Sequence, residues 1–236
     1  MGPRIHPRSR AAPGRGVRGL FSMIRVKCAE VGKRFGRRWV LRSVSFSMES
    51  GAVLCIIGPN GSGKTTLLKI VCTTVLPDEG CCEVGGYDVV RHGPQARRLI
   101  GAACWAERSF YHRLTGGGNL EYFGVLAGLS LRQVHARIAE LIPLLGLESV
   151  INMPYRFYSS GLSRRLSIAR ALLCRTPVLA LDEPTANLDP VWAARIHDLI
   201  RSERDRGVCV LMSSHSAHEV ESLGDTVIDL GGMRHC

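Results

Sequence analysis

The segment at residues 58–65 has the residue types of a loop that binds phosphate groups. It reads Gly-Pro-Asn-Gly-Ser-Gly-Lys-Thr and matches the pattern G-x-x-x-x-G-K-[ST]. Glycines let the backbone curl until consecutive N–H groups point at phosphate oxygens. Lys64 adds a positive charge near the terminal phosphates, and the Thr65 hydroxyl is placed to bind Mg²⁺. The predicted nucleotide-binding residues are Gly58, Pro59, Asn60, Gly61, Ser62, Gly63, Lys64, Thr65 and Thr66.

Two adjacent carboxylates follow an apolar run further along the chain. Residues 178–181 read Val-Leu-Ala-Leu, and Asp182 and Glu183 come next. A parallel strand beside the one that precedes the phosphate loop would bring Asp182 to the metal, so Asp182 and Thr65 are the predicted metal ligands. Glu183 is placed to orient or deprotonate an attacking water. Taken alone, the pair could also be acids on a turn before Pro184, but together with the loop it predicts hydrolysis of a nucleoside triphosphate.

These residues require a fold that sets the ends of several strands side by side. The apolar run at 52–57 predicts a strand buried on both faces, and a helix is expected at about 64–76, directly after the loop. In the last third of the chain strands alternate with helices, which is typical of an α/β fold with an open and largely parallel sheet. The predicted strands there are 178–181, 208–212 and 227–230, and the predicted helices are 191–206 and 217–223.

Two further parts complete the predicted fold. Extended segments at 24–30 and 43–48 predict an N-terminal antiparallel β subdomain. The stretch 119–146 has a helical pattern, with a capping box that begins at Ser130, and it does not alternate with strands. We therefore expect a helical subdomain inserted into a P-loop NTPase core. The expected bounds are 24–236 for the domain and about 107–172 for the helical subdomain.

A third motif lies between the phosphate loop and the two carboxylates. Residues 158–172 read Tyr-Ser-Ser-Gly-Leu-Ser-Arg-Arg-Leu-Ser-Ile-Ala-Arg-Ala-Leu. They resemble the signature of the ABC ATPases, L-S-G-G-Q followed by a helix with R-x-x-x-A-R-A-L. Asp189 in Ala-Asn-Leu-Asp resembles the D-loop residue of that family, and His215 resembles its switch histidine. Phe35 holds the place of the aromatic residue that stacks on adenine. The resemblance covers residues 24–230.

The resemblance implies a mechanism that needs two ATPase subunits. In this family two domains hold two ATP molecules between them, each between one phosphate loop and the partner's signature, which here contains Ser159 and Gly161. The implied cofactors are ATP and Mg²⁺. The implied partners are a second ABC ATPase subunit, identical or different, and a transmembrane permease. The remaining site residues that the resemblance implies are Glu183 and His215 for catalysis, and Phe35 and Asp189 for nucleotide binding.

Some of these residues also have ordinary structural explanations. Ser159 could simply cap a helix. Asp189 could be an N-cap followed by Pro190 at the first helical position, or it could serve both purposes. His215 could be an exposed histidine with no role in catalysis, and Phe35 could be a core residue.

The sequence departs from the family pattern at three places. Ser160 and Leu162 replace Gly and Gln of the signature, although Gly161, which allows close backbone approach to phosphate, is kept. The Gln of the family's Q-loop is absent from residues 102–108, which predicts weak or altered coupling to a membrane subunit. The chain also stops at Cys236, before the further strand and helices typical of the family, and we interpret it as a fragment or a shortened reading frame.

The net charge of +11 is concentrated near the start of the chain. Residues 1–22 contain five arginines and no acidic residue, together with several prolines and glycines, so we predict a disordered basic extension. A dispensable extension or translation from Met23 is preferred over a targeting peptide. A nucleic-acid-binding tail is disfavoured because no aromatic residues interleave with the arginines. The nine cysteines form no C-x-x-C pair, which favours reduced thiols in a cytosolic protein.

The apolar runs are too short to cross a bilayer. The longest stretch without Asp, Glu, Lys or Arg has 14 residues, whereas a membrane-spanning helix needs about 20. Another chain must therefore supply any membrane crossing, and we expect a cytoplasmic protein that is peripheral on the inner face of the plasma membrane.

The predicted function is that of the ATP-hydrolysing subunit of an ABC transporter, an exporter of a polysaccharide, lipid or drug-like substrate. No nucleic acid is expected as a partner. One alternative is a soluble ABC-type ATPase that acts on nucleic acid or ribosomes, which is disfavoured because the chain has neither a second ATPase domain nor a long coiled coil. The other alternative is a degenerate, non-hydrolysing half of a heterodimer.

Overall fold

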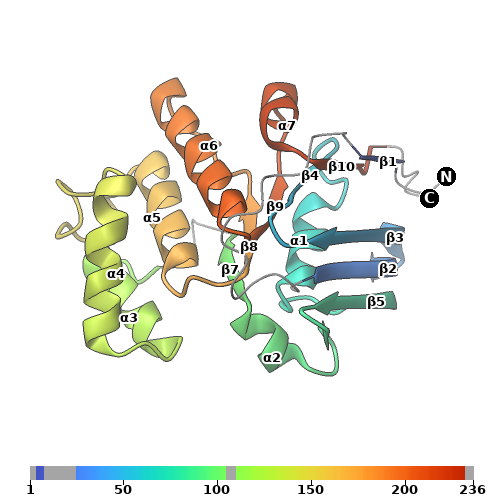
Figure 1. The fold of residues 1–236 in the computed structure, drawn as a ribbon, viewed down its shortest axis with the longest axis horizontal. Coiled ribbons are helices and arrows are strands. Elements are labelled where there is room, and N and C mark those ends of the chain that lie inside the picture. Colours follow the sequence, from blue (N-terminus) through green and yellow to red (C-terminus); the bar gives the residue numbers. More distant parts are fainter. Residues whose placement is uncertain (1–3, 8–24, 105–109, 232–236) are drawn as a thin grey trace.

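The protein is described by a computed structural model at residues 4–7, 25–104 and 110–231. Its centre is a six-stranded sheet with the strand order β1-β10-β4-β9-β8-β7 (Figure 1). All neighbouring strands run parallel except β1, which pairs antiparallel with β10. The prediction of an α/β fold with a largely parallel sheet is therefore confirmed. The strands are β1 (Arg4–Pro7), β4 (Val53–Ile57), β7 (Ile100–Ala103), β8 (Val178–Asp182), β9 (Cys209–Ser213) and β10 (Thr226–Asp229).

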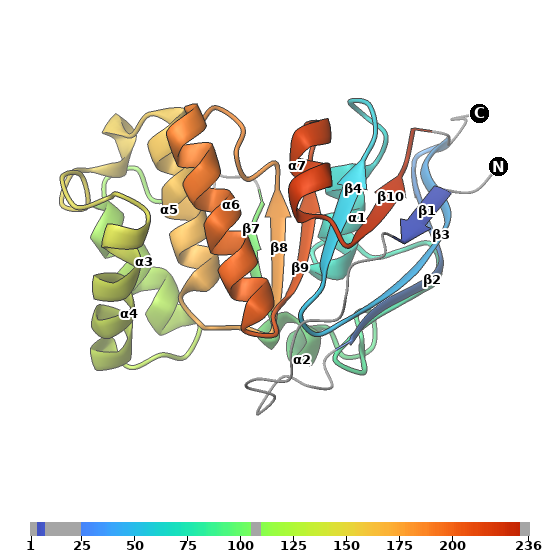
Figure 2. The same ribbon diagram turned by 45° about the horizontal axis from the view of Figure 1, so that its top comes forward.

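The strands of this sheet are apolar throughout because both faces of the sheet are covered. In β4, Val53 and Cys55 belong to a core formed with α5, α6 and α7, whereas Leu54 and Ile56 belong to a second core formed with α1. Successive side chains of a strand point to opposite faces, so burial on both sides produces a continuous apolar run. Figure 2 shows α6 and α7 in front of the sheet and α1 behind it. The helices are α1 (Lys64–Val71), α5 (Ser160–Leu172), α6 (Pro190–Asp205) and α7 (Ala217–Leu223).

A second, antiparallel sheet has the order β3-β2-β5-β6 and shares the α1 core. The predicted antiparallel subdomain is therefore confirmed, but its strands are longer than the sequence pattern indicated. β2 continues to Phe35 because register shifts between Cys28 and Arg34 keep it paired with β3. The strands are β2 (Arg25–Phe35), β3 (Arg38–Glu49), β5 (Glu79–Val84) and β6 (Tyr87–Asp88).

Helix α1 ends at Val71, earlier than the predicted end near residue 76. The backbone of Thr73 has a φ of 60°, a left-handed conformation that interrupts the helix. Its N–H donates to Ile70 O at 3.0 Å rather than continuing the helical pattern. The apolar residues beyond Cys72 therefore belong to a loop.

The helical subdomain lies at the β7 side of the sheet, where α5 packs against β7 (Figure 1). Its α4 begins as predicted: the Ser130 hydroxyl accepts from Gln133 N, and the Gln133 side chain accepts from Ser130 N. The sequence pattern missed α2, which precedes β7. The remaining helices are α2 (Gly93–Arg98), α3 (Gly116–Leu126), α4 (Leu131–Leu144) and the 3₁₀ turn at Tyr155–Phe157.

The segment predicted to be a disordered extension contains β1. Arg4–Pro7 pair with β10 at the edge of the large sheet, so the structure differs from the expectation at these four residues. The rest of that segment lies outside the described residues. No helix within the described part of the chain combines the length and the apolar character needed to span a membrane.

Candidate nucleotide and catalytic site

The loop after β4 curls because its glycines take conformations that side chains disfavour. The φ angle is 143° at Gly58, 78° at Gly61 and 100° at Gly63. A Cβ atom at Gly63 would lie 2.6 Å from Leu41 Cδ2 and 2.9 Å from the Val40 carbonyl oxygen, so no larger residue fits there. The loop thus packs closely on β3 and leads directly into α1.

Lys64, the first residue of α1, points back into the curl of the loop. Its Nζ donates to the carbonyl oxygens of Gly58 at 2.8 Å and Pro59 at 3.1 Å, and the residue is only 6% exposed. Burial lowers the pKa of Lys64, and the negative charges of Glu183 and Asp182 act in the opposite direction. Two main-chain carbonyl oxygens therefore hold Lys64 Nζ within the curl of the loop.

Ser62 shows that the loop fits a phosphate group. Its hydroxyl is buried and has no hydrogen-bond partner among the described residues. A buried hydroxyl left without a partner costs about 1–3 kcal/mol, so a bound acceptor would stabilise it. The N-terminus of α1 adds free N–H groups and a partial positive charge at the same place.

Asp182 reaches this loop from the end of β8, although β8 is not the neighbour of β4 that was expected, because β9 lies between them in the sheet. Its Oδ2 accepts from Thr65 Oγ1 at 2.9 Å, and its Oδ1 accepts from Ser213 Oγ at 2.6 Å. The parallel register pairs Asp182 with Ser213 at the ends of β8 and β9. A carboxylate and a hydroxyl form the hard oxygen set that Mg²⁺ prefers. The two predicted metal ligands are therefore adjacent and fit this ion.

Glu183 and His215 are brought together from the two loops that follow β8 and β9. Glu183 Oε1 lies 2.8 Å from His215 Nε2, and the two side chains are 36% and 42% exposed. The backbone of Glu183 has a φ of 50°, and its N–H donates to Ser213 Oγ at 3.0 Å. A non-glycine residue in this region is strained and persists where its surroundings hold it. His215 is thus an exposed histidine, but one that contacts the candidate base.

The signature residues lie apart from the phosphate loop of the same chain. α5 packs against β7, and β9 and β8 stand between β7 and β4 in the sheet. Within the described residues, no hydrogen bond or ion pair joins Ser159 or Gly161 to the loop after β4. Gly161 instead adjoins the segment after β8, where an added Cβ would lie 3.2 Å from Asn187 O.

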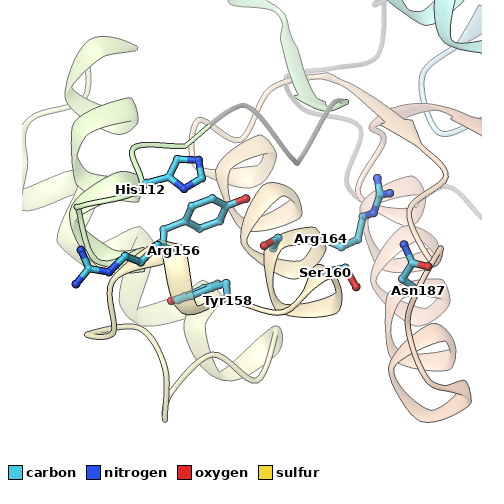
Figure 3. A pocket seen from close by; sticks show the side chains of 8 residues that line it. His112, Arg156, Tyr158, Ser160, Arg164 and Asn187 are labelled. Atoms are coloured by element: carbon cyan, nitrogen blue, oxygen red, sulfur yellow. The ribbon is translucent and has the colours of Figure 1, made fainter.

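A polar pocket of about 230 Å³ lies beside the start of α5 (Figure 3). Ser160 and Arg164 line it from α5, and Asn187 lines it from the segment after β8. Arg164 Nη1 also donates to the main-chain oxygen of Asp182 at 2.8 Å, which links the signature helix to the metal-binding strand. The pocket is lined by His112, Tyr155, Arg156, Tyr158, Ser160, Ser163, Arg164 and Asn187.

The structural roles considered for Ser159 and Asp189 are both observed. Ser159 Oγ accepts from Leu162 N at 3.2 Å at the start of α5, and Asp189 Oδ1 accepts from Trp192 N at 3.0 Å at the start of α6. Pro190 occupies the first position of α6. A capping role leaves a second role open, because the other lone pairs of these oxygens can still accept or contact a ligand.

Phe35 is not a core residue. It is 53% exposed at the end of β2, and Lys33 Nζ lies 5.5 Å from the centre of its ring. The interpretation of Phe35 as core is therefore wrong. In the β3 strand of the same hairpin, Val40 and Leu41 lie close to Gly63 of the phosphate loop.

Sequence reasoning missed Ser213 and Arg164, which connect the predicted residues to each other. Ser213 ends a strand whose prediction stopped at residue 212, and only the parallel register shows that it faces Asp182. Arg164 lies within the signature helix, but its contact with β8 depends on how that helix packs. The region without the expected Gln lies mostly at 105–109, outside the described residues.

Comparison with known proteins agrees with this geometry. A family model described as ABC transporter matches residues 41–186. The ABC transporter ATP-binding protein NatA of Bacillus subtilis is 35% identical over 188 residues, which cover 80% of this chain and 76% of NatA. The daunorubicin resistance ATP-binding protein DrrA3 of Streptomyces coeruleorubidus is 38% identical over 201 residues, which cover 84% of this chain but only 63% of DrrA3.

Solved structures show the same fold. A dimeric structure of the ATP-binding cassette MJ0796, in a post-hydrolysis state bound to ADP and Pi, superimposes with a TM-score of 0.79 at 26% identity. The match covers 87% of this chain and 94% of that one.

Proposed function

The chain belongs to the ABC transporter family, and on that premise we propose that it hydrolyses ATP to power an exporter. The contact between Glu183 and His215, beside Asp182 and Lys64, carries this proposal. A degenerate, non-hydrolysing subunit would not need this complete set of residues. The presence of these residues together therefore favours an active ATPase over a degenerate subunit.

Binding of ATP in this proposal uses the loop and its flanking residues. The backbone N–H groups of the loop after Pro59, at residues 60–66, and the Lys64 ammonium hold the β- and γ-phosphates. Lys64 would exchange its contacts with Gly58 O and Pro59 O for phosphate oxygens. Thr65 and Asp182 would hold Mg²⁺, which when bound neutralises charge on the phosphates.

Hydrolysis in this proposal uses the residues at the ends of β8 and β9. Glu183 accepts a proton from the attacking water. His215 holds Glu183 through the contact at 2.8 Å before the reaction. When Glu183 turns to the water this contact breaks, and His215 Nε2 becomes free to donate a hydrogen bond toward the γ-phosphate. Ser213 fixes the backbone of Glu183 and the carboxylate of Asp182 at the same time.

The proposal requires a second ATPase subunit, because Ser159 and Gly161 lie apart from the chain's own phosphate loop. We infer that they contact the γ-phosphate bound to a partner, with Asp189 at the same interface. Phe35 would stack on adenine, which its exposed ring allows. The dimeric arrangement reported for the cassette MJ0796 supports this geometry.

The membrane partner in this proposal is a permease at the inner face of the plasma membrane. Apolar side chains are exposed on α3 and on the loop before it, which suits a protein interface. Tyr122, Val125 and Leu126 are 42%, 47% and 69% exposed, and the Tyr111 and Tyr122 hydroxyls are 3.1 Å apart. The names of relatives, such as the daunorubicin resistance protein DrrA3, favour a drug-like substrate over a polysaccharide or a lipid.

Co-purification and ATPase assays test the proposal. The chain, expressed in its native host with an affinity tag, should retain a polytopic membrane protein, and the complex should hydrolyse ATP. Glu183→Gln should abolish hydrolysis while the complex still forms. Retention of rRNA or DNA in place of a membrane protein would support the rival function on nucleic acid, and an inactive complex would support a degenerate subunit.

A further inference from the structure

Glu219 is a carboxylate buried behind the catalytic residues. It lies in the first turn of α7 and is only 5% exposed. A buried carboxylate destabilises the fold unless hydrogen bonds satisfy its oxygens. Its partners therefore indicate what it holds in place.

Two hydroxyl groups from the two catalytic loops bind Glu219. Thr185 Oγ1 donates to its Oε1, and Ser214 Oγ donates to its Oε2. Thr185 comes two residues after Glu183, and Ser214 directly precedes His215. One carboxylate therefore ties together the two backbone segments that carry the candidate base and the histidine.

His197 supplies a further contact, from α6. Its Nε2 lies 2.9 Å from Glu219 Oε1, and the residue is 8% exposed. Burial alone would raise the pKa of Glu219, but hydrogen bonds from His197, Ser214 and Thr185 hold that pKa below its ordinary value. The carboxylate is thus charged at neutral pH and both of its oxygens are engaged.

Glu183 and His215 themselves are more than a third exposed, so side-chain packing constrains them little. Their separation therefore depends on the backbone beneath them, which the buried contacts of Glu219 fix. We propose that Glu219 is a positioning residue for ATP hydrolysis, acting through Thr185 and Ser214. His197 anchors it to α6. This inference rests on the proposed function, because it assumes that Glu183 and His215 act on ATP.

Substitution of Glu219 tests the proposal in the complete chain with its permease. We expect Glu219→Ala to lower kcat on the order of tenfold or more, because small displacements of catalytic groups are costly. KM and the affinity for a non-hydrolysable ATP analogue should stay close to those of the unaltered protein. Glu219→Gln, which keeps the shape and one acceptor oxygen, should restore part of the lost kcat.

Glu203→Ala is the matched control. Glu203 is also a buried carboxylate, 9% exposed on α6, but its Oε1 pairs with Arg206 Nη1 at 2.9 Å, and it has no contact with Thr185 or Ser214 among the described hydrogen bonds. Its loss should affect the melting temperature but not kcat. Equal effects of the two alanine variants on kcat, at equal loss of stability, would overturn the proposal.

A spectroscopic measurement separates this inference from the proposed function. The ¹⁵N chemical shifts of the His215 ring report its contact with Glu183, and Glu183→Gln defines the change when that contact is altered. Glu219→Ala should move these shifts in the same direction, and Glu203→Ala should not. If the unaltered protein fails to hydrolyse ATP, the proposed function fails, while these shifts still decide whether Glu219 positions the pair.

Two milder variants keep the proposal testable if Glu219→Ala does not fold. Thr185→Val and Ser214→Ala each remove one hydroxyl donor and should each lower kcat several-fold. Because both act through one carboxylate, their effects should not add to that of Glu219→Gln. Fully additive effects, or unchanged kcat in both variants, would show that the network does not position the catalytic loops.

Discussion

His215 Nε2 lies 2.8 Å from Glu183 Oε1, and this contact joins the loops that follow two adjacent parallel strands. We expect Glu183→Gln to lower ATP turnover about 100-fold or more, since general-base catalysis contributes on that order. Binding of MgATP should remain, because the phosphate loop is unchanged. Turnover of radiolabelled ATP and binding of fluorescent ATP measure the two properties. Glu121→Gln, on the helical subdomain, is the control, and unimpaired turnover in Glu183→Gln would remove this residue from the chemistry.

The buried ammonium of Lys64 should contribute strongly to binding. Lys64→Ala removes a charged donor to phosphate, which is worth about 1.5–3 kcal/mol, so the Kd for MgATP should rise about 10- to 100-fold. Calorimetric titration with a non-hydrolysable analogue measures this change. Lys27→Ala, at an exposed position of β2, should leave the Kd unaltered. Tight binding by the Lys64 variant would contradict the proposed site.

Ser159 both caps α5 and is proposed to meet the partner's ATP, and one substitution separates these roles. Ser159→Asp keeps an N-cap of similar strength but places a negative charge beside the partner's phosphate. The melting temperature should therefore hardly change, while ATP turnover should fall steeply.

Mixing two inactive variants tests whether the site is shared between subunits. A mixture of the Ser159→Asp protein and the Lys64→Ala protein should regain activity. In a mixed dimer, the intact phosphate loop of the first variant meets the intact signature of the second, which gives one working site. Ser130→Asp, at the N-cap of α4, is the matched control and should keep normal turnover. No recovery in the mixture would argue against a shared site.

The exposed ring of Phe35 should contribute to nucleotide binding by stacking on the base. Stacking of a base on an aromatic side chain is worth about 1–3 kcal/mol, so Phe35→Ala should weaken ATP binding roughly fivefold or more, and Phe35→Tyr should not. The same assay on Phe157→Ala, which removes a ring that is 59% exposed, controls for loss of an exposed aromatic residue. An unchanged Kd would show that Phe35 does not contact the base.

Asp78 should make stability depend on pH. The backbone N–H of Arg34 and the side chain of Lys33 hold the pKa of Asp78 below its ordinary value of 3.8. Because the folded pKa is depressed, this carboxylate stabilises the fold above its unfolded pKa, and the contribution is lost as pH falls through the folded value. Asp78→Asn should therefore lower the melting temperature at pH 7, with a difference that shrinks below about pH 4.

Asp198→Asn is the control for this measurement, because its carboxylate is 75% exposed and its ion pair among the described residues is with Arg201, one turn away on the same helix. The change in melting temperature caused by Asp198→Asn should be small at pH 7 and also at pH 3. A melting difference for Asp78→Asn that persists unchanged at pH 3 would show that its charge is not the cause.

The phosphate loop, the carboxylates and the parallel sheet could be predicted because each is encoded locally. Residues 58–65 carry their own conformational requirement, since Gly63 at a φ of 100° admits no larger side chain. The unbroken apolar run at residues 178–181 indicates burial on both faces of the sheet. The end of α1 could not be predicted because Thr73 adopts a left-handed backbone conformation, which threonine as a residue type does not favour.

The sequence by itself therefore determined the fold class and most residues of the candidate site, because glycine conformation, strand burial and capping depend on neighbours along the chain. Only the tertiary structure decided how these residues meet. The contact of Glu183 with His215, the bridge from Ser213 to Asp182 and the burial of Glu219 all join segments distant in sequence. Their partners depend on strand register and helix packing, which no local pattern specifies.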